Sequence, residues 1–355
     1  MSSVPLLSVI MPVHNGRNLI PDTLGALRRS ELDRSRWELI VVDDASTDGT
    51  AEVSESLADT VLRLTGKPNG PAYARNRGAE VCRGSVLVFV DADVRIAPDA
   101  LGKLAQLFDA DPELGAAFGS YDDQPPALGS VSRYRNLLHH YHHHRGAGDA
   151  ETFWAGLGAV RADVFRQVGG FDEVRYARPQ IEDIELGRVI RRAGYRIALD
   201  PTIQGAHLKR WTLGQVLETD LMHRGIPWTR LILSEGAGGG SLNVSPKEKL
   251  CVALVGVGLA ALFGSAVARS AALSWVGAAA LALVIVLNLG MYRYMSRGRG
   301  LRFALAVVPL HFMYYVTGGL AFAVGHIAHR VAPTPVDRRG NAGGAVALRS
   351  KADEP

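Results

Sequence analysis

The stretch Val86-Leu-Val-Phe-Val-Asp91-Ala-Asp93 sets five apolar residues directly before two carboxylates. A continuous apolar run of this length is typical of a strand buried on both faces, as in a parallel sheet covered by helices. In open α/β sheets, ligands bind just beyond the carboxyl ends of such strands. We therefore expect Asp91 and Asp93 to lie at a ligand-binding edge. The alternative is an acidic turn, because Asp is common in turns.

A second apolar run, Leu39-Ile-Val-Val42, ends in the same way, at Asp43 and Asp44. Helical patterns separate the two runs, and this alternation predicts βαβ units with a parallel sheet. Two strands then deliver carboxylate pairs to one edge. Carboxylate oxygens suit Mg²⁺ or Mn²⁺, which commonly share their coordination with substrate phosphates. The sequence therefore predicts a divalent-cation site at this edge.

The same patterns predict the other elements of an α/β domain. Further strands are expected over residues 6–11, 61–64, 116–121, 153–160 and 195–199, and helices over 21–29, 72–82, 98–108, 130–145, 161–170 and 182–193. The last helix is amphipathic, with apolar residues on one side and arginines on another. We expect one domain over residues 1–233 that has helices on both faces of its sheet.

Composition excludes some classes of protein. The net charge is only +4, and no basic cluster is interleaved with aromatic residues, so we expect no nucleic-acid partner. The two cysteines, Cys82 and Cys251, lie far apart, which suits a reducing compartment. The run His139-His-Tyr-His-His-His144 lacks the cysteine or adjacent carboxylate that would complete a zinc site. We expect that run to belong to a substrate-binding loop or to a helix that faces the membrane.

The composition changes after residue 233. A Gly- and Ser-rich linker (234–249) precedes three apolar segments, 250–268, 271–292 and 303–328, which contain no Lys, Arg, Asp or Glu. Segments of roughly 20 such residues are long enough to cross a bilayer. We therefore expect a transmembrane region of about three helices over residues 250–330 and a polar tail over 331–355.

The basic connector between the second and third segments, Arg293 to Arg302, should stay in the cytoplasm. Two spans separate it from the first domain, which is then cytoplasmic too, in a multi-pass protein of the cell (inner) membrane. A third span would place the arginine-containing tail outside. Pro309, Gly318 and Gly319 leave room for a broken or re-entrant third helix.

Several segments, in order, resemble those of glycosyltransferase family 2. These are residues 8–15, 38–50, 70–78, 91–93 (a DxD motif), 154–172 and 182–183, within a resemblance that covers about residues 8–233. The resemblance is to membrane-anchored, bacterial-type members. It implies an inverting enzyme with the GT-A fold, a Rossmann-like, mostly parallel sheet with helices on both faces, followed here by transmembrane helices.

The resemblance also implies roles for individual residues. Those expected to bind the nucleotide sugar are Pro12, Val13, Asn15, Asp43, Asp44, Arg75, Asn76, Asp91 and Arg210; those on the acceptor side are Trp154, Gly156 and Trp211; those expected at the metal are Asp93, Asp91 and His207. Asp44 is the expected partner of a base N–H. Asp93 is the expected main metal ligand, and Asp91 would contact the ribose or reach the metal through water.

Inverting transfer requires a base that takes the proton of the acceptor hydroxyl. Asp183 is the expected base and Glu182 the alternative, although acids in a first helical turn also complement the helix dipole. The segment His207-Leu-Lys-Arg210-Trp211 resembles the Gln-x-x-Arg-Trp motif of processive family members, with His in place of Gln. Whether transfer is processive or single stays open.

We expect metal-dependent transfer of a sugar from a UDP- or GDP-type donor to a membrane-associated acceptor, either a polyprenyl phosphate or a glycolipid or saccharide. Apolar residues between Trp211 and Trp228 predict a stretch at the membrane interface. Lys209, Arg210, Arg224 and Arg230 punctuate it and are candidates for holding a lipid phosphate. The alternatives are a membrane protein with a non-catalytic nucleotide-binding domain and a nucleotidyltransferase.

Overall fold

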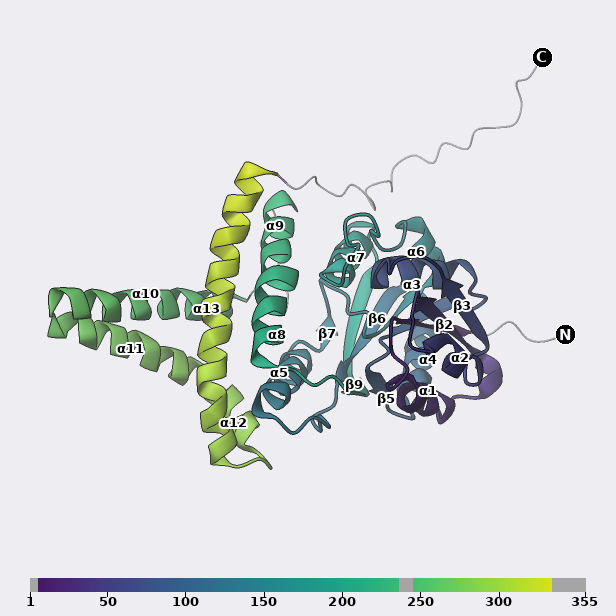
Figure 1. Ribbon diagram of the computed structural model, residues 1–355, viewed down its shortest axis with the longest axis horizontal. Coiled ribbons are helices and arrows are strands. Elements are labelled where there is room, and N and C mark those ends of the chain that lie inside the picture. The colour runs from purple at the N-terminus through teal and green to yellow at the C-terminus, as the bar shows by residue number, and fades with distance from the viewer. Residues whose placement is uncertain (1–5, 236–244, 334–355) are drawn as a thin grey trace, which may run out of the picture.

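The computed structural model describes residues 6–235 and 245–333. An α/β domain forms one part of the molecule, and long helices from the last third of the chain form the other (Figure 1). The expected linker and tail lie largely outside the described residues, although helix α9 extends to Glu235 and helix α10 already begins at Pro246.

A nine-stranded sheet forms the centre of the α/β domain. Its strands are β1 (Leu7–Val13), β2 (Trp37–Asp44), β3 (Thr60–Leu64), β4 (Val86–Val90), β5 (Val94–Ile96), β6 (Leu114–Tyr121), β7 (Gly148–Asp149), β8 (Leu157–Arg161) and β9 (Arg196–His207). The order is β3-β2-β1-β4-β8-β6-β9-β5, with β7 paired to β9. The first four strands are parallel, as expected, whereas β8 runs antiparallel to both β4 and β6, so the complete sheet is mixed.

Helices cover both faces of the sheet. They are α1 (Ile20–Arg28), α2 (Thr50–Glu55), α3 (Pro71–Glu80), α4 (Ala100–Ala110), α5 (Ser130–Arg145), α6 (Ala162–Gln167) and α7 (Glu182–Arg192). Side chains alternate along a strand, so Val9 and Met11 pack toward α1 and α4, while Ile10 packs on the opposite face with α3, α6 and α7. Burial on both faces explains the continuous apolar runs.

Strand register sets the position of the carboxylates. β1 pairs with both β2 and β4, and Ile10 lies opposite Ile40 on one side and Phe89 on the other. The three strands therefore end at one edge, where Asp43 and Asp44 close β2 and Asp91 follows β4. This arrangement confirms the shared edge that the sequence predicts.

Two helices are long and apolar enough to cross a membrane, α10 (Pro246–Ala268) and α13 (Leu301–Val331). The intermediate pair, α11 (Ala271–Leu287) and α12 (Leu289–Ser296), is bent by 58° and could form a third span. The expected break in the third segment is absent, because α13 runs through Pro309 without interruption. The second segment breaks instead, at Asn288, whose side-chain amide donates to the Val284 carbonyl (2.9 Å) and competes with the helix backbone.

Between the α/β domain and α13 lies a layer of α8 (Leu213–Glu218), the π-helix η2 (Thr219–Gly225) and α9 (Ile226–Glu235). α9 and α13 run side by side (Figure 1). Small residues permit this approach: a Cβ on Gly225 would lie 2.4 Å from the Ala321 Cβ, and one on Gly325 would lie 2.7 Å from the Thr229 Cβ. The packing of η2 and α9 against α13 therefore holds the α/β domain next to the apolar helices.

Candidate active site

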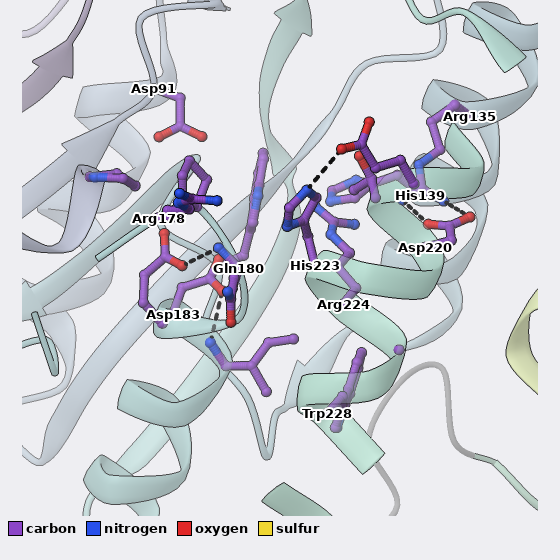
Figure 2. Close-up of a pocket in the computed structure, with 18 of the residues that line it drawn as sticks. Asp91, Arg135, His139, Arg178, Gln180, Asp183, Asp220, His223, Arg224 and Trp228 are labelled. Atoms are coloured by element: carbon purple, nitrogen blue, oxygen red, sulfur yellow. Dashed lines mark hydrogen bonds and ion pairs between the residues drawn. The ribbon is translucent and has the colours of Figure 1, made fainter. Parts of the chain in front are cut away.

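A cavity of about 1500 Å³ lies between the carboxyl edge of the sheet, the start of α7 and the layer of α8, η2 and α9. It also reaches residues of α10 and α13, and Figure 2 shows part of its lining. Predicted site residues that line it are Pro12, Val13, Asp44, Arg75, Asp91, Asp93, Trp154, Glu182, Asp183, His207 and Trp211. Residues separated by 200 positions in the chain thus meet around one space.

Arg75 of α3 links the two acidic segments. Its Nη2 lies 2.7 Å from Asp91 Oδ1 and its Nη1 lies 3.0 Å from Glu182 Oε1. The side chain is only 5% exposed, so its charge is offset by these carboxylates rather than by water. Arg75 therefore lines the cavity as a connector between the sheet edge and α7, and it pairs with one oxygen of the Asp91 carboxylate.

Arg75→Ala should destabilise the protein by about 3–5 kcal/mol, because it leaves two carboxylates without their buried partner. The matched control is Arg77→Ala on the same helix. The Arg77 side chain pairs with Glu80 and Glu173 but is 32% exposed, so its loss should cost less than about 1 kcal/mol. Thermal unfolding of the two purified variants measures the difference. Equal losses would contradict the connector role.

Asp93 and His207 face one another across the edge. His207 Nε2 lies 3.3 Å from Asp93 Oδ2, because β5 and β9 pair with Val94 opposite His207 and Leu208 N–H donates to the Asp93 carbonyl. Burial would raise the pKa of Asp93, but His207 and Lys209 hold it below its ordinary value. The carboxylate is therefore ionised at neutral pH.

The chemistry of this pair fits a divalent cation. His207 Nδ1 lies 2.7 Å from Asn136 Oδ1, so with its proton on Nδ1 the ring could bind a cation through Nε2. Without a cation, a proton on Nε2 favours the ionised Asp93 carboxylate instead. Two facing electron-pair donors suit a bound cation. Within residues 6–235 and 245–333, however, no three His, Cys, Asp or Glu side chains are arranged to hold a metal alone. The expected set is thus brought together only in part, since Arg75 holds Asp91.

The two acids at the start of α7 have different surroundings. Glu182 accepts from Arg75 and, through Oε2, from the Gln180 N–H at 2.9 Å. Asp183 accepts from two backbone groups, the Ile184 N–H at 2.8 Å and the Ala155 N–H at 3.2 Å, and no ion pair joins it to an arginine among the described residues. Burial and the neighbouring Glu182 raise the pKa of Asp183 to about 6. These surroundings favour Asp183 over Glu182 as the group that exchanges a proton.

Asp44 lines the cavity, but its carboxylate already accepts from the backbone N–H groups of Asn69 and Gly70, at 2.9 and 2.7 Å. It thereby fixes the loop before α3. Gly70 has φ +92°, and a Cβ there would lie 2.7 Å from the Ala177 carbonyl, so only glycine fits. Asp44 thus shapes the part of the cavity that Gly70 and Pro71 line.

Three expected nucleotide-binding residues hold loops instead of lining the cavity. Asn15 Oδ1 accepts from the Thr47 N–H at 2.9 Å, Asp43 Oδ1 accepts from the Ser46 N–H at 3.2 Å, and Asn76 bonds to the backbone of Phe171. Their short polar side chains satisfy nearby backbone groups, as is common for Asn and Asp. Sequence alone could not separate this role from ligand contact.

Lys209 rather than Arg210 lies in the cavity. The chain leaves β9 in an extended form, so neighbouring side chains point to opposite sides. Lys209 Nζ lies 4.0 Å from the centre of the Trp211 ring and close enough to Asp93 to affect its pKa. Lys209 is therefore the cation of this segment that could meet an anion in the cavity.

The glycosyl transferase family 2 model matches residues 8–169 of this chain. Residues 8–169 belong to glycosyltransferase family 2. Among curated relatives, the putative teichuronic acid biosynthesis glycosyltransferase TuaG of Bacillus subtilis (strain 168) is 38% identical over 105 residues, 28% of this chain and 40% of that protein. The validoxylamine A glucosyltransferase of Streptomyces hygroscopicus subsp. jinggangensis (strain 5008) is 35% identical over 133 residues, 35% of this chain and 31% of that protein. The matches span less than half of either relative.

The family 2 domain also resembles solved structures. The mannosyltransferase PcManGT from Pyrobaculum calidifontis, in complex with GDP-Man and Mn²⁺, superposes with a TM-score of 0.54 at 20% sequence identity. The match covers 92% of this chain and 87% of that one. The likeness confirms the expected GT-A fold.

An aromatic wall closes one side of the cavity. Trp154 meets Tyr121 edge-on, with ring centres 4.8 Å apart, and His139 of α5 lies 4.7 Å from the same indole. Gly156 lies behind this wall instead of lining the cavity, because a Cβ there would come within 2.4 Å of the Trp154 ring. The wall presents flat faces on which a sugar ring can pack.

Sequence reasoning named no member of the histidine run as a site residue, whereas His139 and His143 line the cavity. Burial lowers the pKa of both, that of His143 to about 3, so they are neutral at physiological pH. Their spacing of four residues places them on one face of α5. This spacing is the feature of the sequence that could have indicated that both line one cavity. Other residues of α5 pack against α12, where Leu137 and Leu138 share an apolar cluster with Met291 and Met295.

Proposed function

We propose that the protein transfers a sugar, with inversion, from a nucleoside diphosphate sugar to a hydroxyl group of a membrane-associated acceptor. The observation that carries the proposal is the shared cavity of Asp183 and the Asp93–His207 pair. One side offers a carboxylate of raised pKa, and the other offers donors that suit a diphosphate-bound cation. Glycosyl transfer needs both functions around one reacting carbon.

In the proposed reaction, the acceptor oxygen forms a bond to the anomeric carbon while the bond from that carbon to the phosphate oxygen breaks. The bonding electron pair leaves with the nucleoside diphosphate, and the hydroxyl proton passes to the Asp183 carboxylate. Lys209 lies beside Asp93 and would stabilise the departing phosphates. Displacement from the face opposite the leaving group inverts the anomeric centre.

Asp93 and His207 would hold Mg²⁺ or Mn²⁺, with the remaining ligands taken from the donor phosphates. Such an ion neutralises charge on the leaving diphosphate. Arg75 leaves Asp91 directed at the donor side of the cavity, where it could accept from a ribose hydroxyl. Support for a divalent ion also comes from the Mn²⁺ in the complex of the similar mannosyltransferase.

The acceptor is proposed to be membrane-associated because the cavity extends to α10 and α13. These are the two helices long and apolar enough to cross a membrane. The basic connector between α12 and α13 favours a cytoplasmic family 2 domain in a multi-pass protein of the cell membrane. A soluble saccharide would have no use for the apolar end of the cavity.

The rate of transfer should rise with pH through about 6, because Asp183 must be ionised to accept a proton and its pKa is raised to about 6. Below that value, kcat/KM should fall roughly ten-fold for each pH unit. Burial lowers the pKa of His143 to about 3 and that of His139 well below its ordinary value, so we expect neither to add a second limb near pH 6. Initial rates from pH 4.5 to 8 measure the profile; a rate that is flat or that falls with increasing pH would contradict the assignment.

The full-length protein, in mixed micelles with a bacterial lipid extract and radiolabelled nucleotide sugars, tests the proposed acceptor. We expect label in the solvent-extractable lipid and an anomeric configuration opposite to that of the donor. Label found only in water-soluble products would overturn the membrane acceptor. Retained configuration would overturn the inverting mechanism.

A further inference from the structure

We propose that the acceptor is a lipid with a phosphate between its hydroxylated headgroup and its apolar chain, and that Arg224 of η2 binds this phosphate. The inference rests on the proposed function and adds the chemical class of the acceptor. It starts from the distribution of charge and apolar surface along the cavity.

Two of the arginines that line the cavity are already held by ion pairs. Arg75 pairs with Asp91 and Glu182, and Arg135 pairs with Asp220, Nη2 to Oδ1, at 2.6 Å. Arg224, by contrast, forms no ion pair with any residue in the described part of the chain, and the acid on its own helix, Asp220, is occupied by Arg135. A guanidinium that lines a cavity without a counter-charge suits an anionic ligand, and phosphate above all.

Arg224 lies between Asp183, the proposed base, and the apolar helices α10 and α13. Its charge is near enough to Asp183 to oppose the rise in the pKa of that carboxyl. The next residue, Gly225, packs directly against Ala321 of α13. Figure 2 shows the Arg224 side chain in the space between Asp183 and the Arg135–Asp220 pair. A phosphate bound by Arg224 would lie next to the headgroup whose hydroxyl is held at Asp183.

Beyond Arg224 the lining comes from three helices, whose apolar side chains are joined by Thr229, Glu248 and Lys249. Trp228 and Ile232 of α9, Val252 of α10 and Phe322 of α13 all line the same cavity. The indole Nε1 of Trp228 is buried and has no hydrogen-bond acceptor among the described residues, so it could donate to a phosphate oxygen. Asp183, Arg224 and these apolar side chains thus lie along the cavity in one order. The order is the same as that of the hydroxyl, the phosphate and the hydrocarbon chain in the proposed lipid.

A neutral glycolipid would leave Arg224 without a counter-charge, and a soluble phosphosugar would leave the apolar end without a chain. Other cations have different places. Lys209 lies beside Asp93, on the donor side, and Lys249 lies in the first turn of α10. Arg178 lies in the loop that packs against Gly70, at the Asp44 end of the cavity. Arg224 is therefore the residue whose removal should separate anionic from neutral lipids.

The test uses the full-length protein in a neutral detergent and dodecyl phosphate as the probe, with dodecyl glucoside as the uncharged comparison. Binding is followed by intrinsic fluorescence, since Trp211 and Trp228 line the cavity. Wild-type protein should bind dodecyl phosphate at least about ten-fold more tightly than dodecyl glucoside, the effect of one charge-assisted contact. Arg224→Gln should abolish that preference.

Arg230→Gln is the matched control, because Arg230 belongs to the same amphipathic stretch but donates to the Ala332 carbonyl at 2.8 Å and does not line the cavity. It should change dodecyl phosphate binding less than about two-fold. Equal binding of both probes by wild-type protein, or equal effects of the two variants, would overturn the proposal.

Titration with nucleoside diphosphates separates this site from the donor site. If Arg224→Gln weakens UDP or GDP binding as much as dodecyl phosphate binding, Arg224 serves the donor and the proposal is wrong. A protein that prefers dodecyl phosphate through Arg224 but never turns over a nucleotide sugar would retain the lipid site and overturn the proposed transfer. The two failures are therefore distinguishable.

Discussion

Asp183→Asn should lower the rate of sugar transfer by about 10²–10⁴-fold, the usual contribution of a general base. The amide keeps the size of the carboxyl and can still accept from the Ala155 N–H, so the fold and the cavity should persist. Because the base acts on the acceptor hydroxyl, binding of the nucleotide sugar should stay near the wild-type value. Single-turnover rates and donor titrations, measured on the same preparation, separate the two quantities.

The matched control is Asp163→Asn, in the first turn of α6. Asp163 accepts from the N–H of the following residue, as Asp183 does, but lies outside the cavity. It should leave the rate within about two-fold of wild type. If Asp183→Asn turns over normally while Glu182→Gln does not, the base is Glu182 and the two roles are exchanged.

Asp93→Ala should reduce turnover by about 10³-fold or more, because it removes the carboxylate that faces His207 and with it the proposed divalent site. Turnover of wild type should require Mg²⁺ or Mn²⁺, and the variant should need far higher concentrations of either ion. Rates measured against metal concentration, with and without excess chelator, test both statements.

Asp122→Ala is the corresponding control, since Asp122 directly follows β6 as Asp91 follows β4, but lies outside the cavity. It should not change the metal requirement. Full turnover of wild-type protein in excess chelator would contradict the metal site, whatever the variants do.

The sequence predicted the elements whose signals are local. The apolar runs before Asp44 and Asp91 identified two buried strands, and parallel strands that start from βαβ units must end at one edge. The amphipathic pattern from Glu182 onward likewise predicted α7, which begins at that residue. These features depend on neighbours in the chain, so local patterns were sufficient.

The parts that were missed depend on contacts between distant residues. Nothing near Arg75 in the sequence indicates that it bridges Asp91 and Glu182, which lie 16 and 107 positions away. The choice of Lys209 over Arg210 depends on where β9 ends, and the break at Asn288 depends on a side-chain bond within the helix. The mixed half of the sheet follows from β8 entering between β4 and β6, a pairing that strand patterns do not specify.

The central proposal for this protein is that its cavity transfers sugars from nucleotide donors. The most direct measurement is the release of free nucleoside diphosphate from a panel of UDP- and GDP-sugars by full-length protein in lipid micelles, with Mn²⁺ present. We predict that at least one donor releases its diphosphate in step with sugar transfer, and that Asp183→Asn abolishes this release. Release of pyrophosphate or nucleoside monophosphate instead, or no release from any donor, would contradict the claim.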